Sequence, residues 1–272
     1  MNESEDHRKI NPITYSCYTR KVREGEQFIP EHVFSFQISG RLMMSDGEHT
    51  YIFESDSFRL TRRNSMLKFV KEPSVDGAYS NVSIFLDQHT LKVLSSENGF
   101  KKEQDFCAPP VIALQSHKLL TNYMASLPPY DDLTDPKNDL LKILKMKELI
   151  LILLELKPGF KDLLFDFSEP GKIDLESFMQ RNYRFNLSLG RFAYLSGRSL
   201  STFKRDFEKI FHSRPGKWLL QKRLQDAHFL MNEKSLSASK VFLEVGFENL
   251  SHFSYAYKKA YGHAPTKPEG KV

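Results

Sequence analysis

Two segments of the chain, residues 197–215 and 246–265, carry side chains that suit contact with nucleic acid. They read GRSLSTFKRDFEKIFHSRP and GFENLSHFSYAYKKAYGHAP. Short hydroxyl side chains approach base edges closely, arginine can bridge a guanine, and lysine supplies positive charge to phosphates. In the first segment the side chains predicted to contact DNA are Ser199, Ser201, Thr202, Lys204, Arg205 and Lys209. In the second they are Asn249, Ser251, His252, Tyr255, Lys258 and Lys259.

The two segments form an internal repeat. From Leu200 onward the matching residues lie 50 positions apart, whereas the glycines Gly197 and Gly246 lie 49 apart. A solenoid needs three or more copies to bury its faces, so the pattern indicates a tandem pair of small modules instead.

Each copy predicts a helix with aromatic residues on one face, because they recur every four positions. These residues are Phe203, Phe207 and Phe211 in the first copy, and Phe253, Tyr257 and Tyr261 in the second. A shorter helix is expected before each one, at 188–195 and 237–245, and Ser188, Ser199 and Ser237 are suitable N-caps. Helix, glycine turn and second helix make a helix-turn-helix, whose second helix enters the major groove.

A third helix is predicted between the copies, over residues 215–232. Pro215 suits its first turn. Its expected apolar face comprises Trp218, Leu220, Leu224, Ala227 and Met231. A continuous helix would hold the two modules at a fixed spacing, so that both could enter successive major grooves about 34 Å apart. The alternative for a single copy is an ordinary αα-hairpin with an aromatic core and a solvated charged face; two copies in one basic region favour DNA binding.

Charge is divided unevenly along the chain. Residues 168–272 hold 18 Lys and Arg against 10 Asp and Glu, a balance of +8, and residues 1–167 hold 21 against 24, a balance of −3. A basic C-terminal half is typical of nucleic-acid binding. An acidic N-terminal half argues against a non-specific architectural DNA binder, which would gain affinity from cations throughout.

The N-terminal half changes from strand-like to helical periodicity. Segments 32–45, 49–63 and 79–87 alternate and are separated by turn clusters, which predicts a sandwich or barrel. Segments 116–127 and 136–157 predict helices, the second beginning at Pro136. The apolar residues of the second helix exceed one stripe, so it packs within the chain, against a second subunit, or both: Leu140, Leu141, Leu144, Ile150, Leu151 and Leu154.

The expected domain organisation follows from these shifts. Residues 167–172, FSEPGK, predict a linker at the point where the charge changes sign. We expect a sensor domain over 1–115, a helical dimerisation or linker segment over 116–167, and a DNA-binding domain over 168–272.

From residue 174 to 267 the sequence resembles the AraC/XylS family of bacterial transcription regulators. The residues that carry the resemblance are Leu189, Ala193, Gly197, Phe203, Arg205, Phe207, Pro215, Arg223, Leu224, Ala227, Leu230, Gly246, Phe247, Ser251, Phe253, Tyr257, Lys258, Gly262 and Pro265. The resemblance implies a seven-helix domain that binds double-stranded promoter DNA and usually activates transcription with RNA polymerase. Phe242, Tyr255 and His212 depart from the family pattern, in which Ala, Arg and Gly are common at these positions.

Residues 28–64 resemble the cupin-type barrel of such regulators. The usual Pro-Gly-Asp turn is replaced by Ser55-Asp56-Ser57, and His32, Glu48 and His49 lack the metal-binding arrangement of enzymatic cupins. We therefore expect no metal, no cofactor and no catalysis. The expected fold class is α+β multidomain, with an N-terminal cupin-like β-barrel, flanking helices, and a C-terminal all-α domain with two helix-turn-helix motifs.

Other classes of function leave no sequence signature. The common nucleophile, phosphate-binding, zinc-protease and dinucleotide motifs are missing, and Cys17 and Cys107 have no catalytic setting. The N-terminus lacks a secretory signal, and the longest apolar run is shorter than the about 20 residues of a membrane span. We expect a cytoplasmic regulator, with three inputs left open: a small-molecule effector, a protein partner and homodimerisation.

Overall fold

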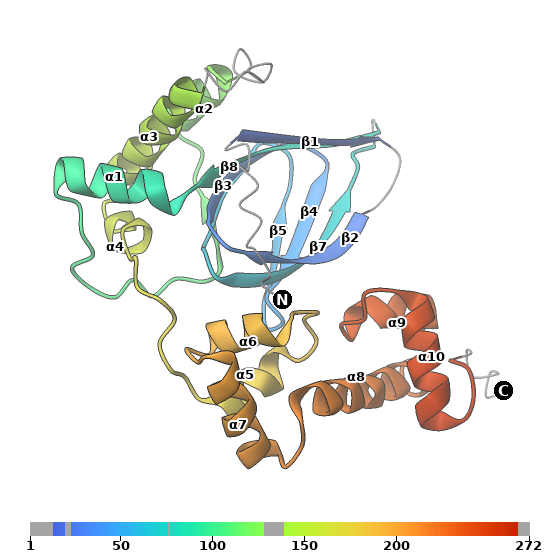
Figure 1. The fold of residues 1–272 in the computed structure, drawn as a ribbon. Coiled ribbons are helices and arrows are strands. Elements are labelled where there is room, and N and C mark those ends of the chain that lie inside the picture. The colour runs from blue at the N-terminus through green and yellow to red at the C-terminus, as the bar shows by residue number, and fades with distance from the viewer. Residues whose placement is uncertain (1–12, 20–22, 76, 128–138, 266–272) are drawn as a thin grey trace. The chain divides into compact units, whose positions relative to one another are not determined.

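The computed structural model describes residues 13–19, 23–75, 77–127 and 139–265. The chain divides into two compact units, Met1–Phe167 and Ser168–Val272 (Figure 1). Among the described residues no helix is both long enough and apolar enough to cross a membrane.

The first unit is built on two antiparallel sheets. The strands are β1 (Ile13–Thr19), β2 (Arg23–Ile29), β3 (His32–Ser39), β4 (Arg41–Ser45), β5 (Thr50–Phe53), β6 (Ser57–Thr61), β7 (Ser65–Glu72), β8 (Ala78–Leu86) and β9 (Val111–Leu114). One sheet has the order β1-β8-β3-β6-β9 and the other β2-β7-β4-β5. The predicted cupin-like β-domain is confirmed, as two facing sheets rather than one closed hydrogen-bonded barrel.

Apolar residues from both sheets form the core between them. Leu42 and Leu67 come from the four-stranded sheet, and Val33, Tyr79 and Val111 from the five-stranded sheet. The other face of the five-stranded sheet is covered by helices α1 (Gln88–Asn98), α2 (Lys118–Ala125), α3 (Asp139–Leu156) and α4 (Phe160–Leu164). The five-stranded sheet is therefore covered on both faces, and its strands bury residues of both alternating sets.

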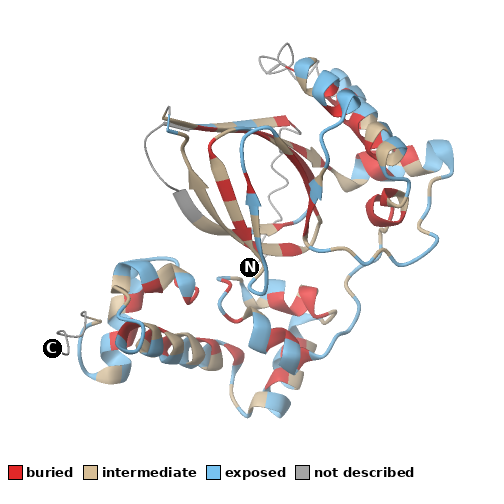
Figure 2. Cartoon of the chain, turned by 180° about the vertical axis from the view of Figure 1, so that it is seen from behind, coloured by how far each residue is buried: buried red, intermediate tan, exposed pale blue. Residues whose placement is uncertain are grey.

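Helix α3 lies within the predicted segment 136–157, while Pro136 falls outside the described residues. One side of α3 faces the core, with Met146, Leu149, Ile150 and Leu153 buried. The other side of the helix is exposed (Figure 2). It carries leucines with exposed fractions of 65% for Leu140, 44% for Leu141, 52% for Leu144 and 47% for Leu151. The apolar excess seen in the sequence therefore corresponds to a second, exposed stripe.

The second unit is helical over its described residues. Its six helices are α5 (Leu175–Asn182), α6 (Leu189–Leu195), α7 (Leu200–Phe211), α8 (Pro215–Asn232), α9 (Ala238–Glu244) and α10 (Leu250–Tyr261). The resemblance implied seven helices, and residues after 265 lie outside the description. Helices α6 and α7 form one helix-turn-helix and α9 and α10 the other, joined by α8 (Figure 1).

The aromatic stripes lie in the cores of the two motifs as predicted, except that Phe211 and Tyr261 at their C-terminal ends are half-buried. Phe203, Phe207 and Phe253 are fully buried, and Tyr257 is 1% exposed. One position on α8 was predicted wrongly: Leu220 is 39% exposed, and Leu219 is buried in its place. Leu219 and Leu220 are adjacent leucines about 100° apart on a helix, so the apolar pattern alone could not distinguish them.

Candidate nucleic-acid interface

Two glycines fix the turn of each helix-turn-helix. Gly197 and Gly246 have φ angles of 67° and 90°, in the region that side chains other than glycine rarely adopt. A Cβ on Gly197 would lie 2.3 Å from the carbonyl carbon of Gly171, and one on Gly246 would lie 2.4 Å from the carbonyl oxygen of Arg184. Each turn therefore packs directly against another stretch of backbone, which sets the angle of the following helix.

A polar side chain caps the first turn of each recognition helix. The Ser199 hydroxyl accepts a hydrogen bond from the Thr202 amide at 3.3 Å, and lies 3.1 Å from the Ser201 hydroxyl. The Asn249 side-chain oxygen accepts from the His252 amide at 2.8 Å. These caps satisfy backbone donors at the helix start, so Ser199 and Asn249 have a structural role whether or not they contact DNA.

The first recognition helix, α7, presents the predicted polar residues on one exposed surface. Ser201, Lys204, Arg205 and Lys209 are exposed, and Thr202 is half-buried. The Arg205 side chain is 67% exposed and its Nε lies 3.8 Å from Asp206 Oδ1. The guanidinium therefore remains accessible to a groove.

The second recognition helix, α10, presents a different set on its exposed surface. Ser251, His252, Lys258 and Lys259 are exposed, and Tyr255 is 70% exposed. The His252 ring packs edge-on against Phe247, with ring centroids 5.5 Å apart. All of the predicted contact residues on both helices have solvent access, so each helix has a polar surface that could face DNA.

The structure adds Arg198, which the sequence reasoning missed. Its guanidinium donates to the carbonyl oxygens of Ile173 at 2.9 Å and Ser196 at 2.7 Å, and to Asp206 Oδ2 at 3.2 Å. The hydrogen bond from Arg198 lowers the pKa of Asp206, and nearby Lys172 adds to this effect. Its place directly after the turn glycine, eight residues before an aspartate, was the available signal.

Arg223 on α8 has a similar structural role. Arg223 is one of the residues that carry the family resemblance, but the sequence did not predict a role for it. Its side chain donates to the carbonyl oxygen of Tyr183 at 2.8 Å and to that of Phe185 at 2.7 Å. Asp226, one turn later, accepts from Arg184 Nε at 2.7 Å. These bonds fix α8 to the segment that follows α5.

The two recognition helices end in the same backbone conformation. His212 caps α7 with a φ of 49°, and Gly262 caps α10 with a φ of 82°. Their amides donate to carbonyl oxygens four residues earlier, at 3.0 Å to Glu208 and 2.8 Å to Lys258. His212, which stands where Gly is common in the family, thus keeps the left-handed cap, although histidine adopts this conformation less readily than glycine.

His32, Glu48 and His49, the residues compared with the metal ligands of enzymatic cupins, lie at different places in the cupin-like unit. His32 is 1% exposed, whereas Glu48 and His49 lie in the turn between β4 and β5. Burial lowers the pKa of His32 to about 3, and Arg63 and Arg62 contribute. Within the described residues no group of three His, Cys, Asp or Glu side chains could hold a metal ion.

The sheet interior also contains polar side chains that the sequence could not assign to a face. Arg59 is 4% exposed, its Nη1 donates to Gln37 Oε1 at 3.3 Å, and its guanidinium lies 5.3 Å from the centre of the Phe53 ring. Burial lowers the pKa of Arg59 to about 10. This cation remains protonated at neutral pH.

Comparison with known proteins gives matches to both units. Residues 193–268 match the helix-turn-helix domain family, and residues 32–163 match the ExsA N-terminal regulatory domain. The thermoregulatory protein LcrF of Yersinia pestis is 26% identical over 241 residues, covering 85% of this chain and 86% of its own. The HTH-type transcriptional regulator ExsA of Pseudomonas aeruginosa is 23% identical over 232 residues, covering 85% and 83%. An apo variant of ToxT from Vibrio cholerae aligns with a TM-score of 0.44 at 14% identity, over 93% of this chain and 95% of that one.

Proposed function

Because this chain belongs to the AraC/XylS family of transcription regulators, we propose that α7 and α10 contact successive major grooves on one face of promoter DNA. The observation that carries the proposal is that α7 and α10, the second helices of the two motifs, each have an exposed polar surface. The relatives named as virulence regulon transcriptional activators support activation as the outcome of binding. Contact with RNA polymerase is the route that we propose for this activation.

Helix α8 supports a fixed spacing between the two contacts. Its 18 residues rise about 27 Å at 1.5 Å per residue. Near its start, Trp218 packs against Phe211 of α7, with ring centroids 4.6 Å apart. Further along, His228 Nδ1 lies 2.7 Å from the Tyr257 hydroxyl of α10. Each recognition helix is thus fastened to a separate stretch of one rigid helix.

The side chains divide into base-reading and phosphate-binding groups in this proposal. Arg205 and Ser201 lie in the first half of α7, where recognition helices contact base edges. Lys258 and Lys259 lie in the last turn of α10 and suit phosphate contacts. The first module would then supply most of the base discrimination, and the second would supply much of the salt-dependent affinity.

A second copy of the chain is the proposed partner of the exposed stripe on α3. Leu140, Leu144 and Leu151 together leave apolar area in water that burial against the same stripe of a twofold-related copy would remove. The Leu144→Glu change is expected to lower the fraction of dimer in sedimentation velocity. Ile52→Glu, which introduces the same charge at a 49% exposed apolar residue of β5, is the matched control. A wild-type chain that sediments as a monomer at every accessible concentration would refute this part of the proposal.

The DNA proposal is tested by footprinting the full-length chain on promoter fragments selected by genome-wide binding. We expect one protected region that spans two adjacent major grooves. Inserting five base pairs between the two contacted blocks should abolish the joint footprint, because the second block then faces away from the protein. Protection that is independent of sequence would instead identify a non-specific DNA-binding protein.

A further inference from the structure

The chain around helix α5 contacts the turns of both helix-turn-helix motifs. We call residues 171–185, which comprise α5 and the residues on either side of it, the α5 segment. Its start packs against the first motif, where a Cβ on Gly197 would lie 2.3 Å from the carbonyl oxygen of Gly171. Its end packs against the second motif, where a Cβ on Gly246 would lie 2.4 Å from the carbonyl oxygen of Arg184. The two motifs are therefore connected through α5 as well as through α8.

Arg198 holds the start of the α5 segment on the first motif. Its Nη1 donates to the carbonyl oxygen of Ile173 at 2.9 Å, and the Ile173 amide donates to the carbonyl oxygen of Ser196 at 3.4 Å. The Phe178 ring of α5 packs edge-on against Phe192 of α6, with ring centroids 6.2 Å apart. Both phenylalanines are buried, so apolar packing and hydrogen bonds together fix this end of the segment.

Arg223 of α8 holds the end of the α5 segment at the second motif. Its Nε donates to the carbonyl oxygen of Tyr183 at 2.8 Å, and its Nη2 donates to that of Phe185 at 2.7 Å. The same Nε would lie 3.1 Å from a Cβ on Gly246, so the guanidinium lies between the α5 segment and the second turn. Because Tyr183 and Phe185 are both buried, little water can replace the arginine at these carbonyl groups.

A second connection matters because α8 alone controls the distance between the recognition helices better than their direction. An α-helix resists stretching, whereas a small module packed on one side of it can shift by sliding of the packed helices. A contact away from the axis of α8, such as the one through Arg223, opposes that shift. Direction is critical for DNA, since neighbouring base pairs are rotated by about 35° around the duplex axis. A recognition helix that turns by a similar angle would lose its register with the groove.

We propose that Arg223 is a positioning residue for DNA recognition, which keeps α10 in a fixed direction relative to α7 by holding the α5 segment against the second turn. This inference rests on the DNA contacts proposed above, and it adds a residue that acts on them through the backbone of the α5 segment. When two modules are linked, the second contact benefits from a high effective concentration, which falls when the modules are loosely oriented. Loss of Arg223 should therefore weaken the joint contact and spare the contact of each motif alone.

The test is gel-shift titration of the full-length chain on DNA that carries both contacted blocks, and on two DNAs in which one or the other block is scrambled. Arg223→Met keeps the aliphatic stem and removes the donors, so it should lower the ratio of two-block to one-block affinity about tenfold. The two one-block affinities should keep their wild-type proportion, which shows that both motifs remain folded. Lys217→Met is the matched control, because it removes an exposed cation from the same helix and should leave the ratio unchanged.

The spacing of the blocks gives a measurement that a uniform loss of stability does not alter. One base pair inserted between the blocks rotates the second block by about 35°, and the wild-type chain should lose about tenfold in two-block affinity. Arg223→Met should lose less on the same insertion, because a loosely held α10 can follow the rotated block. A wild-type ratio together with a wild-type loss on insertion would overturn the proposal.

A double-mutant cycle tests whether the α5 segment acts as one connection. Arg198→Met loosens its start and Arg223→Met loosens its end. If either loss is enough to disconnect the segment, the double variant should change the affinity ratio no more than one of the single variants does. Effects on the ratio that add would mean that the two arginines act separately, and the proposal would be wrong.

Pulsed electron paramagnetic resonance tests the role of Arg223 without DNA. Nitroxide labels are attached at Lys209→Cys and Lys259→Cys, exposed positions of α7 and α10, in a chain that also carries Cys17→Ser and Cys107→Ser. Arg223→Met should broaden the distribution of distances between the labels, and an unchanged width would overturn the proposal. Broadening combined with a wild-type chain that binds one and two blocks alike would refute the joint DNA contact and still support the positioning of α10 by Arg223. The two proposals can therefore fail separately.

Discussion

The two helix-turn-helix motifs of this chain share a scaffold but differ in the surface they present. Gly197 and Gly246 make equivalent turns, Phe203 and Phe253 fill equivalent core positions, and both recognition helices end in a left-handed cap. Positions that fix backbone geometry are therefore the ones retained between the copies. The turn glycines can tolerate little change, because a Cβ on either one would lie within 2.4 Å of backbone outside its own motif.

The exposed and electrostatic positions differ between the copies. Arg205 of the first motif corresponds to Tyr255 of the second, at the offset of 50. Arg198 and Glu248 each precede the N-cap of their recognition helix, Ser199 and Asn249. The Arg198–Asp206 pair, with an N–O distance of 3.2 Å, therefore corresponds to Glu248 and Ala256, which cannot form an ion pair. The first motif has an internal ion pair and an exposed arginine. The second motif has no equivalent ion pair, and the cations on its recognition helix are two lysines in the last turn. We infer that the same backbone geometry supports two different modes of contact with DNA.

Substituting the turn glycines should have the largest effect, and it should be equal in the two motifs. Gly197→Ala and Gly246→Ala each place a Cβ within 2.4 Å of backbone atoms at a positive φ. We expect each to lower the free energy of unfolding by about 3 kcal/mol or more, from left-handed strain plus overpacking. The measurement is urea unfolding, followed for Gly197 by fluorescence of Trp218, the single tryptophan, and for Gly246 by circular dichroism.

Gly216→Ala is the matched control for the turn glycines. A Cβ at Gly216 has no atom within 4 Å, and the residue lies in the first turn of α8. Because alanine is the better helix former, the change should be neutral or stabilise by about 0.5–1 kcal/mol. If all three alanine variants unfolded alike, the argument that the turns require glycine would be wrong.

Substituting Arg198 should destabilise the chain more than substituting its counterpart in the second motif. Its side chain is 7% exposed and serves two backbone carbonyls as well as Asp206. Arg198→Met should lower the free energy of unfolding by about 2–3 kcal/mol, because charged hydrogen bonds are lost and their buried acceptors left unpaired. Glu248→Met at the equivalent, exposed position should change it little. Equal losses would contradict the difference in internal support.

The same pair predicts a dependence on pH. The pKa of Asp206 is lowered in the folded chain from its ordinary value of 3.8, chiefly by the hydrogen bond from Arg198. The resulting stabilisation is present above pH 3.8 and is lost as pH falls through the lower folded value. Acid unfolding curves below pH 4 should therefore be flatter for Arg198→Met than for the wild-type chain.

The sequence predicted the helical unit well because its signals are local. Helix α8 begins and ends where the pattern of residues 215–232 placed it, since proline starts it and polar residues follow it. The repeat fixed both recognition helices by mutual comparison. By contrast, strands β1, β2 and β7 were missed, because their identity depends on pairing partners distant in sequence, such as Ile13 with Ile84. Helix α1 was also missed, although Asp87 and Gly99 cap it locally.

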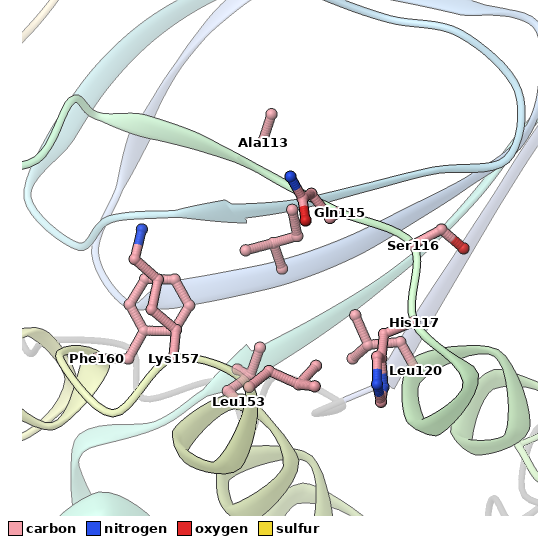
Figure 3. Close-up of a pocket in the computed structure, with 10 residues that line it drawn as sticks. Ala113, Gln115, Ser116, His117, Leu120, Leu153, Lys157 and Phe160 are labelled. Carbon is pink, nitrogen blue, oxygen red and sulfur yellow. The ribbon is translucent and has the colours of Figure 1, made fainter.

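The candidate site divides in the same way. Exposure of Arg205 and Lys259 followed from the helical period, because the aromatic stripe leaves one face outside. The role of Arg198 did not, since its acceptor at Ile173 lies 25 residues earlier in the chain. A cavity of about 410 Å³ in the first unit combines residues from 113 to 160 and left no local signal (Figure 3). Sequence patterns predict which residues are exposed, but only the fold shows which of them contact one another.

Changes on the two recognition surfaces should affect DNA binding in different ways. Arg205→Ala should cost about 1–3 kcal/mol of binding free energy and relax specificity at one base pair, if the guanidinium pairs a guanine. Tyr255→Ala, the equivalent change, should affect specificity less. Lys259→Ala should weaken binding to all sequences alike and reduce the slope of affinity against salt by about one unit. Gel-shift titrations on a full set of single-base variants, at several salt concentrations, measure all three.

The smallest expected effect concerns the caps of the two recognition helices. His212 and Gly262 share a left-handed backbone, which costs a non-glycine residue about 1–2 kcal/mol. Part of that cost is offset because glycine loses more conformational entropy on folding, so His212→Gly should stabilise the chain by about 0.5–1 kcal/mol. The reverse test is Gly262→Ala, where a Cβ would meet nothing within 4 Å, so any loss reports backbone strain alone. Changes of opposite sign in the free energy of unfolding, measured in urea, would show that the two caps require the same left-handed backbone and differ only in the residue that adopts it. Destabilisation by His212→Gly would mean instead that the imidazole makes a compensating contact that glycine cannot replace.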